Sequence, residues 1–383
     1  QTKLDGNPRK FLDSKRINDL GFKCLLISST FHHNNKKHRT QNLNQYKQRL
    51  SENTKIMVMV KAFGYGGGSL EIANVLQFHH IDYLGVAYLD EAIALRKNGI
   101  ETPIMVMNPD LDQLEIFRDY NLEPEIYNLA GLKKVLTLVS KPKIHLKIDT
   151  GMHRLGFDPS EVYEIKRLLS VGTVEVAGIF THFSMADMPL EDNFTHKQGQ
   201  IFKQTYDILT EGQISKPLKY ACNSTAIVRF PEYQFDMVRL GIGLYGFDPS
   251  GSMKLAQVSV LKTRISQIKK VKKGEHVGYG TDGRAKRDVT IAIVPIGYAD
   301  GYGRIFGRGR GFMDLNNHNV PTIGNICMDM TMLDVTGLNC SEGDRVIVFG
   351  ENPTIENLAE WAQTIPYEIL TSISERVSRI FIG

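Results

Sequence analysis

The chain has 383 residues, 42% of them hydrophobic and 23% charged, with a formal net charge of only +4. This length exceeds one ordinary domain and fits two, and the composition is that of a globular protein. The scattered basic residues argue against a nucleic-acid-binding face, and no apolar run approaches the ~18 residues that a membrane helix needs. We therefore expect a two-domain protein that binds neither nucleic acid nor membrane.

From residue 55 to residue 245, short β-rich runs alternate with amphipathic helical stretches. Eight such runs are predicted as strands, at 55–61, 81–88, 102–108, 122–128, 143–150, 174–183, 220–226 and 237–245. Helices are predicted between most of them, for example at 69–80, 89–98, 129–140 and 160–170. Regular βα alternation is typical of a parallel sheet, and eight repeats within about 190 residues favour a (β/α)8 TIM-type barrel over a doubly wound sheet.

The pattern changes near Leu255. Strand-like runs at 257–268, 288–296, 331–335 and 345–349 follow one another with turns and little helix, and two helical segments close the chain at 355–363 and 367–374. We predict an α/β fold in which the barrel spans residues 42–254. A separate, β-rich C-terminal domain spans residues 255–383.

Chemistry in such a barrel is expected at the C-terminal ends of the strands. Cationic side chains and a histidine fall at or just beyond these ends, namely Lys61, Lys147, Arg154, His182 and Arg239. A lysine in a partly desolvated site can have a pKa low enough for its amine to form a Schiff base. We therefore interpret Lys61, at the end of the first strand, as a nucleophile for an aldehyde.

The loops after the seventh and eighth strands of a barrel commonly bind phosphate. Ser224 offers a hydroxyl in the first of these loops, and Gly241 and Ile242 offer backbone N–H groups in the second. A lysine for an aldehyde, a phosphate site and a nearby arginine together indicate a pyridoxal-phosphate pocket.

Other motifs are interpreted without a ligand. The glycine-rich stretch 64–69 lacks the GK[ST] ending of a P-loop. The stretch 278–283 matches G-x-G-x-x-G, but a charged turn and a strand follow it rather than a helix. The histidine-rich run 32–38 has adjacent lysines and no carboxylate, so we interpret it as a solvated loop and predict no metal site. Four cysteines without a CxxC pair indicate reduced thiols in the cytoplasm.

Nine motifs in order resemble those of the alanine racemase family, from about Asn42 to the C-terminus. In the barrel they are VKAFGYGGG (60–68), HLKIDTGMHRLG (145–156), GIFTHFSMAD (178–187), ACNSTAIVRFP (221–231) and MVRLGIGLYG (237–246). In the tail they are VGYGTDG (277–283), PIGYADGYGR (295–304), GNICMDMTMLDV (324–335) and IPYEIL (365–370). The resemblance implies a pyridoxal-5'-phosphate-dependent isomerase that interconverts L- and D-alanine and supplies D-alanine for peptidoglycan.

The resemblance also implies roles for individual residues. Lys61 would hold the cofactor and serve as one catalytic base, and Tyr279 would be the opposite base, acting in the partner subunit's site of a homodimer. Arg239 would face the pyridine nitrogen, and His182 would link Arg239 towards Tyr279. The remaining cofactor-binding residues would be Tyr65, Asn223, Ser224, Gly241, Ile242 and Tyr367. Arg154 would hold the substrate carboxylate, and Met328 would also line the site. Tyr298 and Arg304 would belong to the path by which the substrate enters. Lys147 matches a lysine that is often carbamylated and that orients Arg154.

Elementary chemistry agrees with these implied roles. Racemisation removes a proton from one face of Cα and delivers one to the other face, so two bases are wanted. Four other hypotheses remain open. Two are enzymes: a barrel-type decarboxylase, which should lack the set formed by His182, Arg239 and Tyr279, and a racemase for serine or a wider range of amino acids. The other two are a non-catalytic cofactor-binding protein and, because of the N-terminal segment, a folding-impaired relic of a racemase.

The N-terminal segment 1–41 departs from the family pattern. Residues 42–53 are expected to form the helix before the first barrel strand, but 23–40 do not match the strand with which such enzymes usually begin. Residues 1–23 instead resemble the C-terminal end of GDP-fucose synthase-type reductases. This segment therefore puts the stability of the β-rich domain in question.

Overall fold

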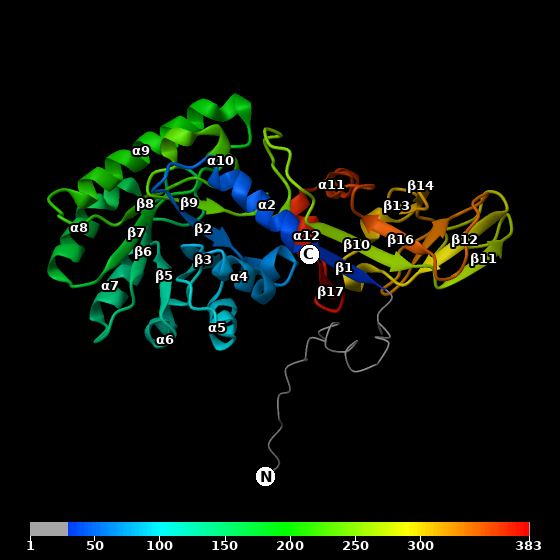
Figure 1. Cartoon of the computed structure of the whole chain (residues 1–383), viewed down its shortest axis with the longest axis horizontal. Helices are drawn as coiled ribbons and strands as arrows, with labels where there is room; N and C mark the ends of the chain where they lie inside the picture. The colour runs from blue at the N-terminus through cyan, green and yellow to red at the C-terminus, as the bar shows by residue number, and fades with distance from the viewer. Residues whose placement is uncertain (1–29, 383) are drawn as a thin grey trace, which may run out of the picture.

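Figure 1 shows a computed structural model of the chain, which describes residues 30–382; the resemblance of residues 1–23 to a reductase lies outside them. Eight parallel strands close into a barrel in the order β2 to β9, as predicted. Their bounds are Lys55–Met59, Tyr83–Val86, Ile104–Val106, Leu122–Ile126, Ile144–Lys147, Val176–Phe180, Leu218–Tyr220 and Met237–Leu240. Most positions of these strands are buried, as in a sheet covered on both faces.

Helices surround the barrel. The longer ones are α4 (Ser69–Phe78), α5 (Leu89–Lys97), α6 (Leu114–Asp119), α7 (Leu129–Thr137), α8 (Val162–Val171), α9 (Asp192–Thr210) and α10 (Ser224–Arg229). The prediction of a strand at 220–226 was wrong in part, because β8 ends at Tyr220. The Asn223 side chain accepts a hydrogen bond from the backbone N–H of Ala226, and this cap starts a helix where the sequence suggested a strand.

The chain leaves the barrel after the short helix η5 (Ile242–Tyr245) and enters a β-rich region (Figure 1). A six-stranded sheet has the order β14-β13-β16-β10-β1-β17, and a three-stranded sheet has the order β11-β12-β15. The strands are β10 (Ser259–Arg264), β11 (Gln267–Val271), β12 (Val289–Val294), β13 (Phe312–Leu315), β14 (His318–Pro321), β15 (Thr331–Asp334), β16 (Arg345–Phe349) and β17 (Ser378–Ile382). Two helices, α11 (Ile355–Ala362) and α12 (Pro366–Thr371), follow β16.

The N-terminal segment does contain a strand, so the expectation that 23–40 lacks one was wrong. Strand β1 (Phe31–Asn35) pairs antiparallel with β10 and parallel with β17, and it completes the six-stranded sheet. Helix α2 (Lys36–Lys47) begins directly after it, six residues earlier than predicted (42 − 36). The Asn35 side chain caps this helix by accepting from the backbone N–H of His38. A strand made mostly of polar residues thus pairs with β17, which lies near the C-terminus.

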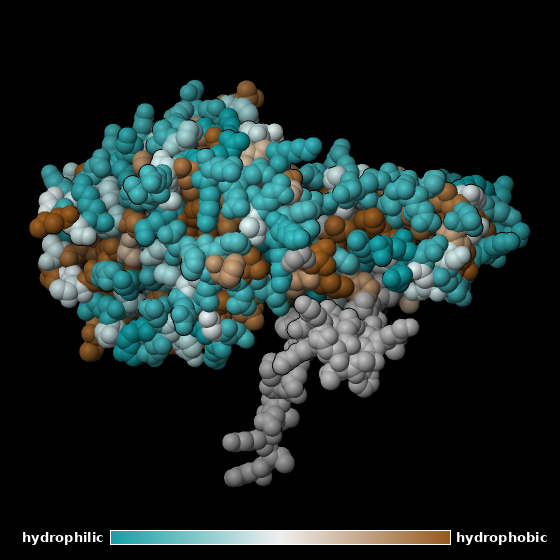
Figure 2. All heavy atoms as spheres, viewed as in Figure 1, coloured by the Kyte–Doolittle hydropathy of each residue, from teal (hydrophilic) through white to brown (hydrophobic). Residues whose placement is uncertain are grey.

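The surface of the molecule is mixed. Figure 2 shows a mainly hydrophilic face on which hydrophobic residues gather in separate groups over the barrel and over the β-rich region. Within residues 30–382, no helix is both long enough and apolar enough to cross a bilayer.

Candidate active site

The barrel mouth, meaning the C-terminal ends of β2 to β9 with the loops that follow, begins with Lys61. A short turn, α3 (Lys61–Tyr65), follows β2, and Ala62, Phe63 and Gly64 within it all have left-handed backbone angles. The carboxylate of Glu91 fixes this turn by accepting from the Ala62 N–H at 2.6 Å. Burial lowers the pKa of the Lys61 amine, and the charges of Arg154 and Arg239 lower it further.

Helix α12 of the β-rich region supports the same turn. Gly66 lies so close to the carbonyl oxygen of Leu370 that a Cβ atom would collide with it, and its φ of +74° also favours glycine. This contact brings Tyr367 beside Tyr65, with ring centroids 6.1 Å apart. Tyr65 also stacks on Tyr245 at 4.4 Å. Three tyrosines therefore lie together on one side of the mouth, of which the sequence analysis named Tyr65 and Tyr367.

The predicted phosphate residues lie together on the adjoining side. The Ser224 hydroxyl, at the start of α10, accepts from the backbone N–H groups of Gly241 at 2.9 Å and Gly243 at 3.3 Å. A Cβ atom at Gly241 would lie only 2.9 Å from the Tyr65 hydroxyl. Glycine at this position thus keeps open a cradle bounded by two hydroxyls and by the start of η5. Asn223 holds the loop by donating to the carbonyl of Phe183 at 3.1 Å.

Arg239 extends from β9, the strand next to β2, and is buried. Its Nη2 donates to the carbonyls of Thr181 at 2.8 Å and Ala221 at 3.1 Å and lies 3.1 Å from Nδ1 of His182. Since a guanidinium only donates, Nδ1 of His182 accepts and its proton lies on Nε2. Burial, followed by the charge of Arg239, lowers the pKa of His182 well below 6.5. A neutral histidine thus presents an N–H away from Arg239.

The mouth also contains a carboxylate that the sequence analysis missed. Glu125 of β5 lies 3.0 Å from Nζ of Lys147 at the end of β6, and both side chains are buried. Burial lowers the pKa of Lys147 and raises that of Glu125, while each opposite charge counteracts this effect. Arg154 is exposed beyond them, in the loop that the Asp149 carboxylate caps by accepting from three successive backbone N–H groups.

The remaining predicted residues lie in the β-rich region. Tyr279, Tyr298 and Met328 have exposed fractions of 73%, 43% and 53%, and Arg304 is exposed as well. Tyr279 lies in the loop between β11 and β12, and Figure 1 places these strands at the end of the molecule away from the barrel. The structure therefore brings the residues predicted to bind the cofactor together within one chain but leaves Tyr279 apart from Lys61.

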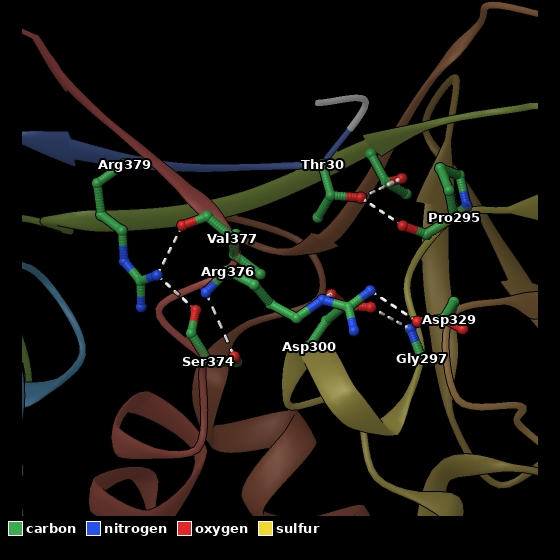
Figure 3. A network of polar contacts seen from close by, with 10 residues as sticks. Thr30, Pro295, Gly297, Asp300, Asp329, Ser374, Arg376, Val377 and Arg379 are labelled. Atoms are coloured by element: carbon green, nitrogen blue, oxygen red, sulfur yellow. Dashed lines mark hydrogen bonds and ion pairs between the residues drawn. The ribbon is translucent and has the colours of Figure 1, made fainter. Parts of the chain in front are cut away.

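Two loops of the β-rich region are held by one arginine, as Figure 3 shows. Arg376 pairs with Asp300 at 2.9 Å and donates to Asp329 at 2.7 Å. These carboxylates stand two residues after Tyr298 and one residue after Met328. Asp300 in addition accepts from the backbone N–H of Gly297 at 2.8 Å. Arg376 thereby fixes the spacing of the two loops.

The residues present fit pyridoxal phosphate. The Nε of Arg239 is buried without a hydrogen-bond partner among residues 30–382, so it can donate to a ring nitrogen. The cradle at Gly241 can take a phosphate, and Lys61 offers an amine of lowered pKa across the mouth. The three features correspond to the three parts of the cofactor that a protein has to hold.

Comparison with known proteins identifies the family. Residues 35–249 match the N-terminal domain of alanine racemases, and residues 258–381 match the C-terminal domain. The chain belongs to the alanine racemase family. It is 36% identical over 356 residues to alanine racemase 1 of Clostridium acetobutylicum, covering 88% of this chain and 91% of that one.

Solved structures of racemases have the same architecture. The alanine racemase of Clostridium difficile 630 superposes with a TM-score of 0.87 at 36% identity, covering 93% of this chain and 96% of that one. The alanine racemase of Bartonella henselae, solved with covalently bound pyridoxal phosphate, gives 0.85 at 28% identity, covering 93% and 100%. Alanine racemases are pyridoxal-phosphate-dependent isomerases that supply D-alanine for peptidoglycan, and both the family and the fold predicted from the sequence are confirmed.

Proposed function

We propose that this chain interconverts L- and D-alanine, with Lys61 and Tyr279 as bases on opposite faces of Cα and with their sites shared between two subunits. The observation that carries the proposal is the Arg239–His182 contact next to Lys61 in one barrel mouth. A protein that only binds the cofactor through Lys61 has no need for a histidine paired with Arg239. When bound, pyridoxal phosphate withdraws electrons from the amino acid's Cα, which makes its proton removable.

Lys61 acts on one face of Cα. Its lowered pKa leaves a fraction of the amine neutral, so it can hold the cofactor and accept a proton. Arg239 supplies an N–H to the ring nitrogen, and it keeps its own proton because a guanidinium is not deprotonated in proteins. By donating without giving up its proton, Arg239 would keep the ring nitrogen of a bound cofactor unprotonated, and this would favour quick return of a proton to Cα over side reactions.

Tyr279 of the partner subunit acts on the other face. A tyrosine serves as a base near neutral pH only when neighbours stabilise its phenolate. The Nε2–H of His182 can do so, because Nδ1 is engaged by Arg239. Arg154 holds the substrate carboxylate, and Tyr65, Ser224, Gly241, Ile242 and Tyr367 bind the phosphate, with Asn223 supporting that loop.

The shared site rests on the surface of the β-rich region. Exposed large hydrophobic side chains collect there, namely Tyr279, Tyr298, Ile305, Met328, Met330 and Ile365. Surfaces of this kind are typical of protein interfaces. We infer a two-fold dimer, in which residues 255–383 of each chain cover the partner's barrel mouth over residues 42–254. Met328, Tyr298 and Arg304 would then line the path of the substrate.

Alanine is the proposed substrate, with serine a slower alternative. Tyr298, Tyr367 and Met328 are bulky, and together they would narrow the pocket against longer side chains. The enzyme would act in the cytoplasm, where the free thiols of Cys222, Cys327 and Cys340 stay reduced. A panel of L-amino acids tests the assignment: a higher kcat/KM for lysine or arginine than for alanine would contradict it.

Complementation tests the shared site. Lys61→Ala and Tyr279→Ala homodimers should each be nearly inactive. After subunit exchange, half of the dimers are mixed and each has one intact site, so activity should recover to about a quarter of wild type. Verified mixed dimers without recovery would place both bases in one chain and overturn the proposal.

A further inference from the structure

The barrel interior contains two buried acid–base pairs, one above the other, between β5 and β6. Glu123 lies 2.6 Å from Nε2 of His145, and Glu125, two residues later, lies 3.0 Å from Nζ of Lys147. In the parallel register, Glu125 is opposite His145. Because side chains of a strand alternate, both glutamates point into the barrel. The lower pair continues to the hydroxyl of Tyr220, 2.8 Å from Nδ1 of His145, and both of its residues lie nearer the N-terminal ends of β5 and β6 than Glu125 and Lys147 do.

The upper pair faces the mouth. Glu125 has an exposed fraction of 0%; Lys147 lies 3.0 Å from one of its oxygen atoms, and the other oxygen has no hydrogen-bond partner among residues 30–382. The positive charges of Arg154 and Arg239 act on it in addition to that of Lys147. Arg239 lies over the Phe180 ring at 5.1 Å, and Lys147 lies over the same ring at 5.7 Å. A buried carboxylate with acceptor capacity left over thus stands beneath several cations.

A buried carboxylate is costly unless a cation pairs with it and its remaining acceptor sites are filled. Lys147 occupies one side of Glu125, whereas Arg154 is exposed in the loop above. An arginine can reach a carboxylate with a fork of donors, which the second oxygen of Glu125 would accept. The charges of Lys147, Arg239 and Arg154 each favour the ionised form of the carboxylate.

We propose that Glu125 is the buried anion that positions Arg154 for the substrate carboxylate, and that it keeps Lys147 as an unmodified ammonium ion. The proposal rests on the role given to Arg154 in the proposed function. Glu125 is a positioning residue, because it acts on the substrate through Arg154.

The proposal excludes one modification of Lys147. A neutral lysine amine attacks CO2, an N–C bond forms, and a proton leaves, so that a cation becomes a carbamate anion. At Lys147 this product would place a second negative charge beside Glu125 in a site closed to water. Like charges at this distance strongly disfavour each other. The carboxylate that an anionic lysine would supply is already present in the chain.

The first test needs no activity. The holoenzyme is incubated with ¹³C-labelled bicarbonate and examined by ¹³C NMR. Wild type should show no carbamate signal, and the Glu125→Gln variant should gain one that is lost in Glu125→Gln/Lys147→Arg. A carbamate signal in wild type that disappears in Lys147→Arg would overturn the proposal, whether or not the protein racemises alanine.

The second test is kinetic. Glu125→Gln should raise KM for alanine about tenfold while kcat stays within about threefold, because the substrate carboxylate is held less well. Bicarbonate should lower this KM again in the variant and leave wild type unchanged. Glu123→Gln is the matched control, since it removes a buried carboxylate from the same strand but not from the mouth, and its KM should equal that of wild type.

The outcomes separate the two proposals. An unchanged KM in folded Glu125→Gln, or an equal rise in Glu123→Gln, would contradict the role of Glu125. No racemisation of alanine by wild type would instead contradict the proposed function, and the NMR result would still decide the state of Lys147.

Discussion

Two buried arginines differ in what surrounds them. Arg239 in the barrel mouth donates to two carbonyls and to His182, and of its buried nitrogen atoms only Nε has no hydrogen-bond partner among residues 30–382. Arg39 of α2 is as deeply buried, but it donates only to the Asn34 side chain, at 3.3 Å. Its Nε and Nη1 have no hydrogen-bond partner within residues 30–382, and its guanidinium lies over the Tyr245 ring, 5.6 Å from the ring centroid.

The same contrast extends to the segments around them. Within 32–39, the side-chain N–H group of Asn34 is also buried without a hydrogen-bond partner in the described part of the chain, and the His32 imidazole meets only the backbone of Gly66 without a well-aligned hydrogen bond. Unsatisfied buried groups cost about 1–3 kcal/mol each. In the mouth this cost is offset by partners and by the cofactor. In the strand β1 and helix α2, nothing described offsets it, so the backbone fits the fold while the side chains fit it poorly.

The largest effect is expected in the mouth. Lys61→Ala should lower kcat by about 10⁴-fold or more, because it removes a base and the group that anchors the cofactor. Racemisation of alanine followed by polarimetry measures it. Lys55→Ala, at the other end of the same strand and half-exposed beside Asp82, should retain wild-type activity. Borohydride reduction should fix the cofactor on the peptide that contains Lys61, and labelling of another lysine would contradict the assignment.

The next effect is a gain in stability. The triple variant His32→Leu, Asn34→Ile and Arg39→Leu should raise the free energy of unfolding by about 3 kcal/mol, since it replaces unpaired buried polar groups by apolar ones. Urea denaturation measures the change. Arg239→Met should act in the opposite direction, because it leaves the carbonyls of Thr181 and Ala221 unpaired. A triple variant no more stable than wild type would show that the polar atoms of the segment have partners after all.

The stability of the protein at low pH should show the effect of one of these buried polar groups, the imidazole of His32. Burial lowers the pKa of His32 from 6.5 to about 3, so the folded state favours its neutral form. Stability from this group is complete above pH 6.5 and is lost, at about 1.4 kcal/mol per pH unit, as the pH falls from 6.5 towards 3. His32→Leu should therefore gain about 2 kcal/mol over wild type between pH 7 and pH 5. A difference that does not change with pH would contradict the neutral, buried histidine.

The smallest effect is expected at the loops of the β-rich region. Arg376→Ala should raise KM for alanine about threefold, because the half-exposed arginine joins the loops of Tyr298 and Met328 through ion pairs of modest strength. Steady-state kinetics measure it. Arg167→Ala removes an exposed ion pair with Glu164 on α8 and should leave KM unchanged. A kcat loss without a change in KM would place Arg376 in another role.

The barrel was predictable because its signals are repeated. Eight apolar runs at regular spacing leave few alternatives, and the motif residues fall at strand ends in any such barrel. Strand β1 was not predictable, because FHHNN has one apolar residue and its pairing partners lie more than 200 residues away. Strands β13, β14 and β17 were missed as well, since they are short and each of them carries polar residues.

The candidate site shows the same limit. The cluster around Arg239 and His182 follows from strand order, whereas Glu125 needs the register between β5 and β6. A signal was present in LEPEI, where the glutamates alternate with apolar residues, but alternation alone does not tell a barrel interior from a solvated edge. The separation of Tyr279 from Lys61 likewise depends on how the two regions are arranged in space.

The position of β1 in its sheet has a consequence for the timing of synthesis. Phe31 pairs with Ser378 of β17, which leaves the ribosome 347 residues later (378 − 31). At a translation rate of about 5–20 residues per second, the edge of β1 that pairs with β17 stays unpaired for roughly 17–70 s. An apolar strand with a bare edge would offer neighbouring nascent chains a template for pairing throughout this interval. The histidines and asparagines of β1 make a poor template for such pairing. The same residues that lower the stability of the folded sheet therefore also disfavour aggregation of the partly synthesised chain.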